Sequence, residues 1–61
     1  MTERRQQILN LLIEGLTANE IGDILGISGH TVRKIKKKML AWFGAKNDNQ
    51  MIYLAIKEMY L

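Results

Sequence analysis

The tripeptide Gly26-Ile27-Ser28 constrains the fold more than any other feature, because it lies between two segments with helical periodicity. Glycine adopts the positive φ angle that ends many helices, and serine is a preferred residue for starting the next one. Ile21, Leu25 and Val32 lie where two such helices bury side chains against each other. The sequence therefore predicts two short helices joined by a tight turn, which is a helix-turn-helix unit.

Glycines and capping residues divide the whole chain in the same way. Thr17-Ala18-Asn19-Glu20 has the pattern of a capping box, in which the first and last side chains each accept a free backbone N–H. Gly15 and Gly44 are placed to end the first and third helices. The predicted helices span residues 3–14, 18–25, 29–43 and 49–60. With 61 residues, no proline and 48% apolar residues, residues 1–61 are expected to form one all-α, four-helix domain.

Apolar periodicity predicts which sides of these helices are buried. In the helix 29–43 the expected buried stripe is Val32, Ile35, Met39, Trp42 and Phe43. The residues expected to be least exposed in the domain are Leu9, Leu12, Ile21, Leu25, Val32, Ile35 and Met39. Gly22 is expected where the helix 18–25 comes so close to the next helix that only a small residue fits.

The opposite side of the helix 29–43 is cationic, and this helix contains no acidic residue. This side and its flanks carry His30, Arg33, Lys34, Lys36, Lys37 and Lys38. Arg33 and Lys37 are four residues apart and repel each other, so the arrangement gains stability only beside an anionic partner. A charge run is often no more than a solvated face. Because this one lies on the second helix of a helix-turn-helix pattern, we expect double-stranded DNA as the partner.

The cationic side chains are expected to make different contacts with DNA. Arg33 and Lys37 can donate to guanine O6 and N7, whereas the flanking Lys36 and Lys38 can neutralise phosphates. The start of the helix around Ser28 offers free backbone N–H groups and the positive end of the helix dipole, which suit a phosphate.

Other classes of function have little support in the sequence. The chain has no cysteine and a single histidine, His30, so disulfides and a metal site built from these residues are excluded. No nucleophile–base pair, paired carboxylates or phosphate loop is present, so we expect neither an enzyme nor a cofactor. The longest apolar stretches, such as 51–56, are far shorter than the roughly 20 residues of a membrane span. With no secretory signal either, we expect a cytoplasmic, nucleoid-associated protein without membrane contact.

The chain resembles the LuxR/GerE-type DNA-binding domain of bacterial transcription regulators over nearly its whole length. The matching motifs are Thr2-x-Arg4, Ile8-Leu9-x-Leu11-Leu12, Gly15-x-Thr17-x-x-Glu20-Ile21, Leu25-Gly26-Ile27-Ser28-x-x-Thr31-Val32-Arg33 and Phe43-Gly44-Ala45-Lys46-Asn47. The chain departs from the usual residues of the family at Arg5, Gly22, Ile35, Trp42 and Asp48, the last of which replaces a common arginine.

The resemblance implies that the third helix enters the major groove and that the fourth often mediates dimerisation. By position, Arg33, Lys34 and Lys37 match base-facing sites, and Thr31 matches a residue near the DNA backbone. The residues expected at the backbone are Ser28, His30, Thr31, Lys36 and Lys38. On the helix 49–60, a flank away from Ala55 carries Tyr53, Ile56 and Tyr60, which we expect to pair with a second copy. These three could instead be scattered surface residues or cover part of the first helix.

Two functions are compatible with these features. The first is a sequence-specific regulator of transcription that binds an inverted-repeat site as a homodimer. The alternative is an interaction module that pairs through its last helix with a larger regulator of the same family and inhibits or redirects it. RNA polymerase is a further candidate partner of a regulator. A general nucleoid or RNA binder is disfavoured, because the charge lies on one helix without interleaved aromatic residues.

The sequence starts at Met1, about where the DNA-binding domain of the family starts. The resemblance therefore leaves open a small stand-alone regulator and the C-terminal domain of a larger one. The polar start Met-Thr-Glu-Arg-Arg favours the stand-alone form.

Overall fold

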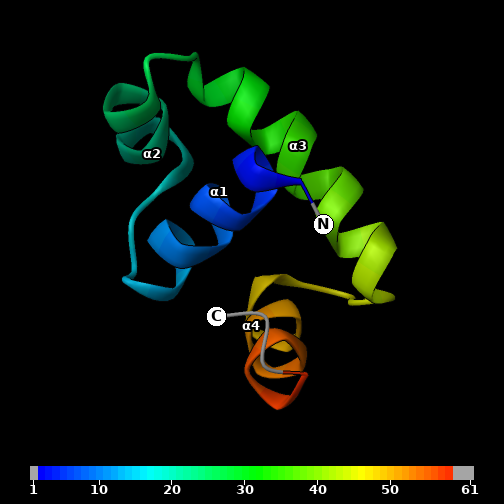
Figure 1. The fold of residues 1–61 in the computed structure, drawn as a ribbon. Coiled ribbons are helices and arrows are strands. Elements are labelled where there is room, and N and C mark those ends of the chain that lie inside the picture. The colour runs from blue at the N-terminus through cyan, green and yellow to red at the C-terminus, as the bar shows by residue number, and fades with distance from the viewer. Residues whose placement is uncertain (1, 59–61) are drawn as a thin grey trace.

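The computed structural model describes residues 2–58, which form four helices and no strand. The helices are α1 (Glu3–Ile13), α2 (Ala18–Leu25), α3 (Gly29–Phe43) and α4 (Asp48–Lys57). Figure 1 shows α1 in the middle of the molecule, with α2 and the long α3 above it and α4 below. None of the described helices is long and apolar enough to cross a membrane. The all-α fold expected from the sequence is confirmed.

The ends of α1 and α4 differ from the predicted ones, whereas α2 and α3 have the expected bounds. α1 ends at Ile13, one residue early, because Glu14 is already its C-cap and the chain turns at Gly15 with φ +92°. α4 begins one residue early, at Asp48, because Asn47 is its N-cap. It ends at Lys57, and residues 59 and 60 of the predicted helix lie outside the described residues.

Each helix starts at a side chain that caps it in the same way. The four N-cap side chains accept a hydrogen bond from the backbone N–H three residues on, and they are Thr2, Thr17, Ser28 and Asn47. At α2 the capping box is complete, because the Glu20 carboxylate also accepts the Thr17 N–H at 2.8 Å. These hydrogen bonds favour the charged carboxylate and lower the pKa of Glu20 below its ordinary value.

The turn between α2 and α3 depends on two glycines. Gly26 ends α2 with φ +73°, a conformation that L side chains rarely adopt. Gly22 lies one turn earlier, and a Cβ atom there would be 2.5 Å from the Ile27 carbonyl oxygen and 3.1 Å from the Gly29 nitrogen. The predicted requirement for a small residue at Gly22 is therefore confirmed, and the obstacle is the backbone of the turn.

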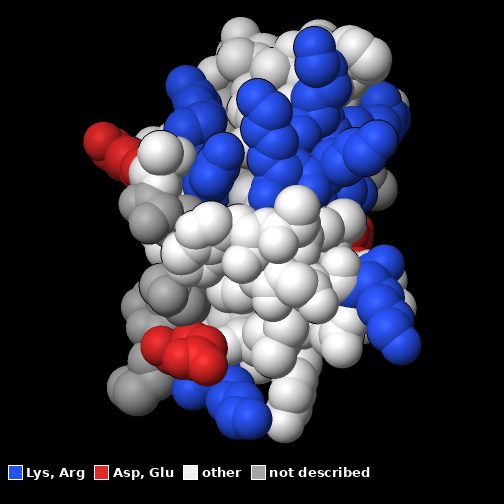
Figure 2. Space-filling model, turned by 90° about the vertical axis from the view of Figure 1, so that its right-hand side faces the viewer, with Lys and Arg blue, Asp and Glu red and all other residues white. Residues whose placement is uncertain are grey.

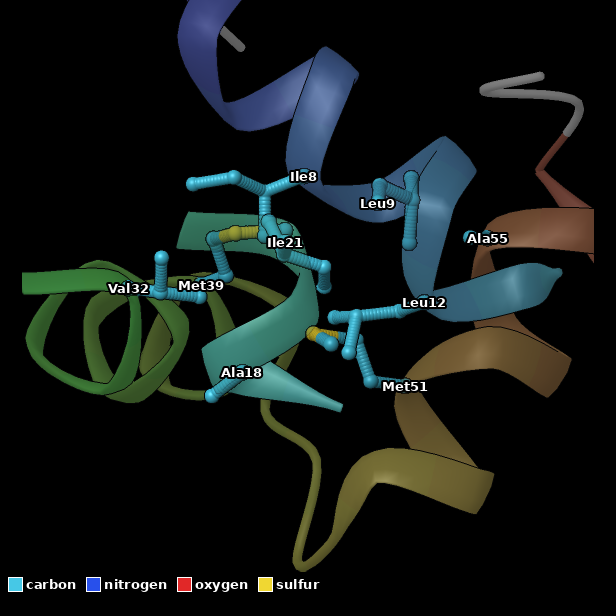
Figure 3. Packing of buried hydrophobic residues seen from close by; sticks show 9 residues of the cluster. All are labelled: Ile8, Leu9, Leu12, Ala18, Ile21, Val32, Met39, Met51 and Ala55. Atoms are coloured by element: carbon cyan, nitrogen blue, oxygen red, sulfur yellow. The ribbon is translucent and has the colours of Figure 1, made fainter. Parts of the chain in front are cut away.

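The core lies where all four helices meet around α1 (Figure 3). Its buried residues are Ile8, Leu9, Leu12, Ala18, Ile21, Val32, Met39, Met51 and Ala55. Five of the seven residues expected to be least exposed belong to this set. The prediction is wrong for Leu25 and Ile35, because both are only half-buried at the edge of the core. Ile8 is buried together with its neighbour Leu9, since α1 contacts helices on more than one side.

The expected buried stripe of α3 is also wrong at its last turn. The side chain of Trp42 is 48% exposed, whereas Phe43 packs against the core. Met39 and Phe43 are four residues apart and nearly in line along the helix, so Phe43 continues the buried row. Trp42 lies to the side and meets the Phe43 ring edge-on, with centroids 4.9 Å apart.

Candidate nucleic-acid interface

The outward side of α3 is set by its buried side. Val32 and Met39 point into the core, so residues on the opposite side of the helix must face solvent. The exposed residues on that side are His30, Arg33, Lys34, Lys37 and Lys38. Figure 2 shows Lys and Arg side chains gathered over the upper part of one face of the molecule, at the height of α3. The predicted cationic face is therefore present and accessible.

Lys34, Lys37 and Lys38 keep their charge uncompensated at close range. Among residues 2–58, Lys36 forms an ion pair with an N···O distance below 4.0 Å. Lys34, Lys37 and Lys38 have no carboxylate within that distance. Like charges three or four residues apart on a helix repel one another. The energetic cost of gathering them here can be offset by an anion bound outside the protein.

Arg33 has a defined position at the edge of this surface. Its Nη2 donates a hydrogen bond of 3.0 Å to Oδ1 of Asn19, in the first turn of α2. The guanidinium group therefore lies against the neighbouring helix, although the side chain remains exposed. The role of Asn19 was not recognised in the sequence, because a contact between residues 14 positions apart leaves no local pattern.

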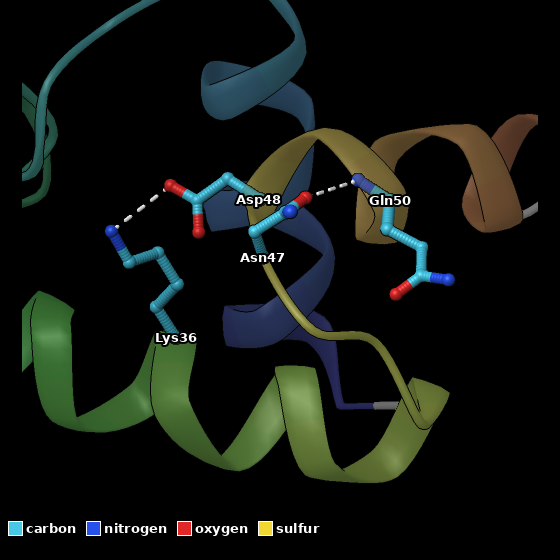
Figure 4. Close-up of polar contacts among 4 residues, drawn as sticks. All are labelled: Lys36, Asn47, Asp48 and Gln50. Carbon is cyan, nitrogen blue, oxygen red and sulfur yellow. Dashed lines mark hydrogen bonds and ion pairs between the residues drawn. The ribbon is translucent and has the colours of Figure 1, made fainter.

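Lys36 lies apart from the other cations of α3. It is half-buried, and its Nζ is 3.1 Å from Oδ2 of Asp48 in the first turn of α4 (Figure 4). Asp48 also lies near the positive end of the α4 dipole, which favours its negative charge. Lys36 was expected at the DNA backbone, and in the structure its side chain reaches Asp48 of α4.

The remaining polar residues at the start of α3 serve the helix itself. The Ser28 Oγ atom accepts the Thr31 N–H at 3.0 Å, and the two hydroxyl oxygens are 2.9 Å apart in a further hydrogen bond. His30 is exposed beside them. These three residues border the cationic face, and Ser28 also caps the helix. No group of three or more His, Asp or Glu side chains in residues 2–58 could hold a metal ion.

The exposed residues of α4 include two large apolar side chains. Tyr53 is 61% exposed and Ile56 is 52% exposed, whereas Met51 and Ala55 are buried, as the predicted register of this helix requires. Tyr60, the third residue of the expected dimer contact, lies outside the described residues. A cavity of about 210 Å³ between the ends of α3 and α4 is lined by Trp42, Phe43, Leu54 and Glu58. Figure 2 shows a broad area without charged side chains below the cationic face.

Comparisons with known proteins agree with the resemblance found in the sequence. Residues 1–55 match the family described as bacterial regulatory proteins, luxR family. The chain is also 37% identical, over 57 residues, to a protein of Porphyra purpurea named probable transcriptional regulator ycf29. This match covers 93% of the chain and 27% of that protein, so the chain spans about a quarter of its relative. No solved structure gives a significant match. The chain therefore belongs to the LuxR family of bacterial regulatory proteins, whose helix-turn-helix fold it shares.

Proposed function

We propose that this domain binds specific sites in double-stranded DNA, with α3 in the major groove. The observation that carries the proposal is the outward side of α3, where three lysines have no carboxylate within 4.0 Å among residues 2–58. Gly22 lets the turn of residues 26–28 pack closely on α2, and this turn sets the orientation in which the cationic side of α3 is presented. A fixed cationic helix matches the shape and charge of the major groove.

The positions of the side chains suggest what each contacts. Lys34 and Lys37 point most directly away from the core, and we assign them to base edges, where lysine donates to guanine O6 and N7. Lys38 lies on the flank and is assigned to a phosphate, together with the groups around Ser28. Lys36 is assigned to Asp48 instead of DNA, because its ammonium group already pairs with that carboxylate at 3.1 Å.

The domain is further proposed to act as a homodimer through α4. Tyr53 and Ile56 expose large apolar surface on one helix, which is the kind of patch that a second copy can cover with the same patch. In such a dimer the two α3 helices must reach successive major grooves, about 34–36 Å apart for half-sites separated by one turn of DNA. The binding site is then an inverted repeat.

Selection of bound duplexes from a random pool tests this proposal. We expect enrichment of an inverted repeat, with the same half-site on both strands. Enrichment of a single half-site would retain major-groove recognition and remove the dimer. Recovery of the random pool without any enriched sequence would contradict sequence-specific binding. The alternative function, pairing with a larger regulator without DNA contact, predicts that no duplex is retained even at low salt.

A further inference from the structure

Asn19 and Arg33 form a polar bridge between the two helices of the helix-turn-helix unit. Asn19 is the second residue of α2, and Arg33 is in the second turn of α3. The 3.0 Å hydrogen bond joins the Asn19 amide oxygen to the Arg33 guanidinium. Because the guanidinium can only donate, the orientation of the Asn19 amide is determined, and its NH₂ group faces away from Arg33.

The position of Asn19 is restrained from two further sides. The capping box of Thr17 and Glu20 holds the first turn of α2. On the other side, the Asn19 amide lies over Gly29, where an added Cβ atom would collide with Oδ1 of Asn19. Gly29 therefore leaves the space that the Asn19 side chain fills. Because Asn19 is restrained in this way, its hydrogen bond confines the Arg33 guanidinium to the α2 side of α3.

A neutral amide positions Arg33 without cancelling its charge. In this arrangement the acceptor oxygen of Asn19 faces Arg33, and the guanidinium keeps further N–H donors for a ligand. A carboxylate at the same position would bind Arg33 more strongly but would neutralise it. The pair therefore presents donors and one positive charge, which suit a phosphate oxygen.

We propose that Arg33 contacts a DNA phosphate, positioned by Asn19, and does not read a base. In helix-turn-helix complexes the first helix of the unit crosses the DNA backbone while the second lies in the groove. A guanidinium held against α2 is therefore at the backbone side of α3. This inference rests on the proposed DNA binding and changes the role expected for Arg33, leaving Lys34 and Lys37 to read bases.

The first test is Arg33→Gln, measured on the selected site and on its single-base variants. We expect about fivefold weaker binding at 0.15 M salt on every sequence, because each neutralised phosphate contributes a salt exponent of about 0.9. The slope of log K against log salt should fall by about 0.9. Lys57→Gln removes the same charge on α4 and should change neither value. If Arg33→Gln relaxes the preference at one base pair, Arg33 reads a base and the phosphate assignment is overturned.

The second test asks whether Asn19 acts through Arg33. Asn19→Leu keeps the size of the side chain and removes the hydrogen bond, so it should weaken binding by less than Arg33→Gln does. In the double variant the change at Asn19 should add nothing, because the group that it positions is absent. Independent, additive losses would overturn the positioning role.

Asn19→Asp separates this role from a purely structural one. Asp is favourable in the first turn of a helix and can pair with Arg33, so the variant should unfold at the parental temperature or above it. Its DNA affinity should nevertheless fall about as far as that of Arg33→Gln. Ile24→Asp places the same charge on an exposed position of α2 and should have a smaller effect. Equal losses for the two Asp variants would overturn the proposal, and a parent chain that retains no duplex would overturn DNA binding itself.

Discussion

The exposed sides of α3 and α4 carry different kinds of side chain. α3 exposes four cations, Arg33, Lys34, Lys37 and Lys38, whereas α4 exposes two large apolar side chains, Tyr53 and Ile56. The ion pair of Lys36 and Asp48 joins the two helices. The difference in exposed side chains suggests that α3 and α4 meet different partners, an anion at α3 and an apolar surface at α4.

The largest expected effect comes from the core that supports both surfaces. Met39 is buried beneath α1, so Met39→Ala should reduce the free energy of unfolding by about 2–5 kcal/mol. Ile35 is half-buried, and Ile35→Ala should cost less than Met39→Ala. Urea denaturation followed by circular dichroism measures both. A larger loss at Ile35 would contradict the orientation of α3 and, with it, the separation of the two surfaces.

The apolar surface of α4 can be tested by Ile56→Glu. A charge in a self-complementary apolar contact should weaken dimerisation by about 2 kcal/mol or more. Because Ile56 is exposed within one copy, the variant should remain folded. Sedimentation across a range of concentrations should give a dimer for the parent and a monomer for the variant. If both have the same mass at every concentration, α4 does not form the dimer contact.

The boundary between the surfaces predicts a contrast between two lysines that the sequence alone places in the same class. Lys38→Met should reduce the salt slope of DNA binding by about 0.9 and leave the unfolding temperature unchanged. Lys36→Met should leave the salt slope unchanged and reduce stability by at most about 1 kcal/mol, because its ion pair with Asp48 is partly exposed. If the two variants behaved alike on DNA, Lys36 would belong to the cationic face.

The smallest expected effect concerns acid and the α2 end of the cationic surface. Since hydrogen bonds to Thr17 lower the pKa of Glu20 in the folded chain, its contribution to stability is present above the unfolded pKa, near 4.5. That contribution is lost as the pH falls through the lower folded pKa. Glu20→Gln keeps an acceptor and does not titrate, so its unfolding temperature should decrease less than that of the parent between pH 5 and pH 3. Parallel curves for the two chains would contradict the charged capping box.

The features that the sequence predicted well depend on neighbouring residues. The capping box at Thr17, the cap at Ser28 and the glycine turn at Gly26 act within a few positions, so α2 and α3 could be bounded correctly. The LuxR-type motifs cover the same region, and the cationic side follows from the helical period. Family membership and fold class were therefore accessible before the structure was known.

The features that the sequence missed depend on where distant segments meet. Helical periodicity places Trp42 near the buried side of α3, but it does not show that Phe43, and not Trp42, continues the core. The partners of Arg33 and Lys36 lie 14 and 12 positions away, and neither Asn19 nor Asp48 belongs to a motif with them. Separating cations that face solvent from those paired with other side chains requires this tertiary arrangement.

Binding of Lys37→Ala to the selected site and its single-base variants tests most directly whether the cationic side of α3 reads DNA. The substitution should reduce the free energy of DNA binding by about 1–3 kcal/mol and relax the base preference at one base pair in each half-site. Lys57→Ala on α4 is the matched control and should keep the affinity and preference of the parent. An equal, sequence-independent loss in both variants would contradict recognition by α3.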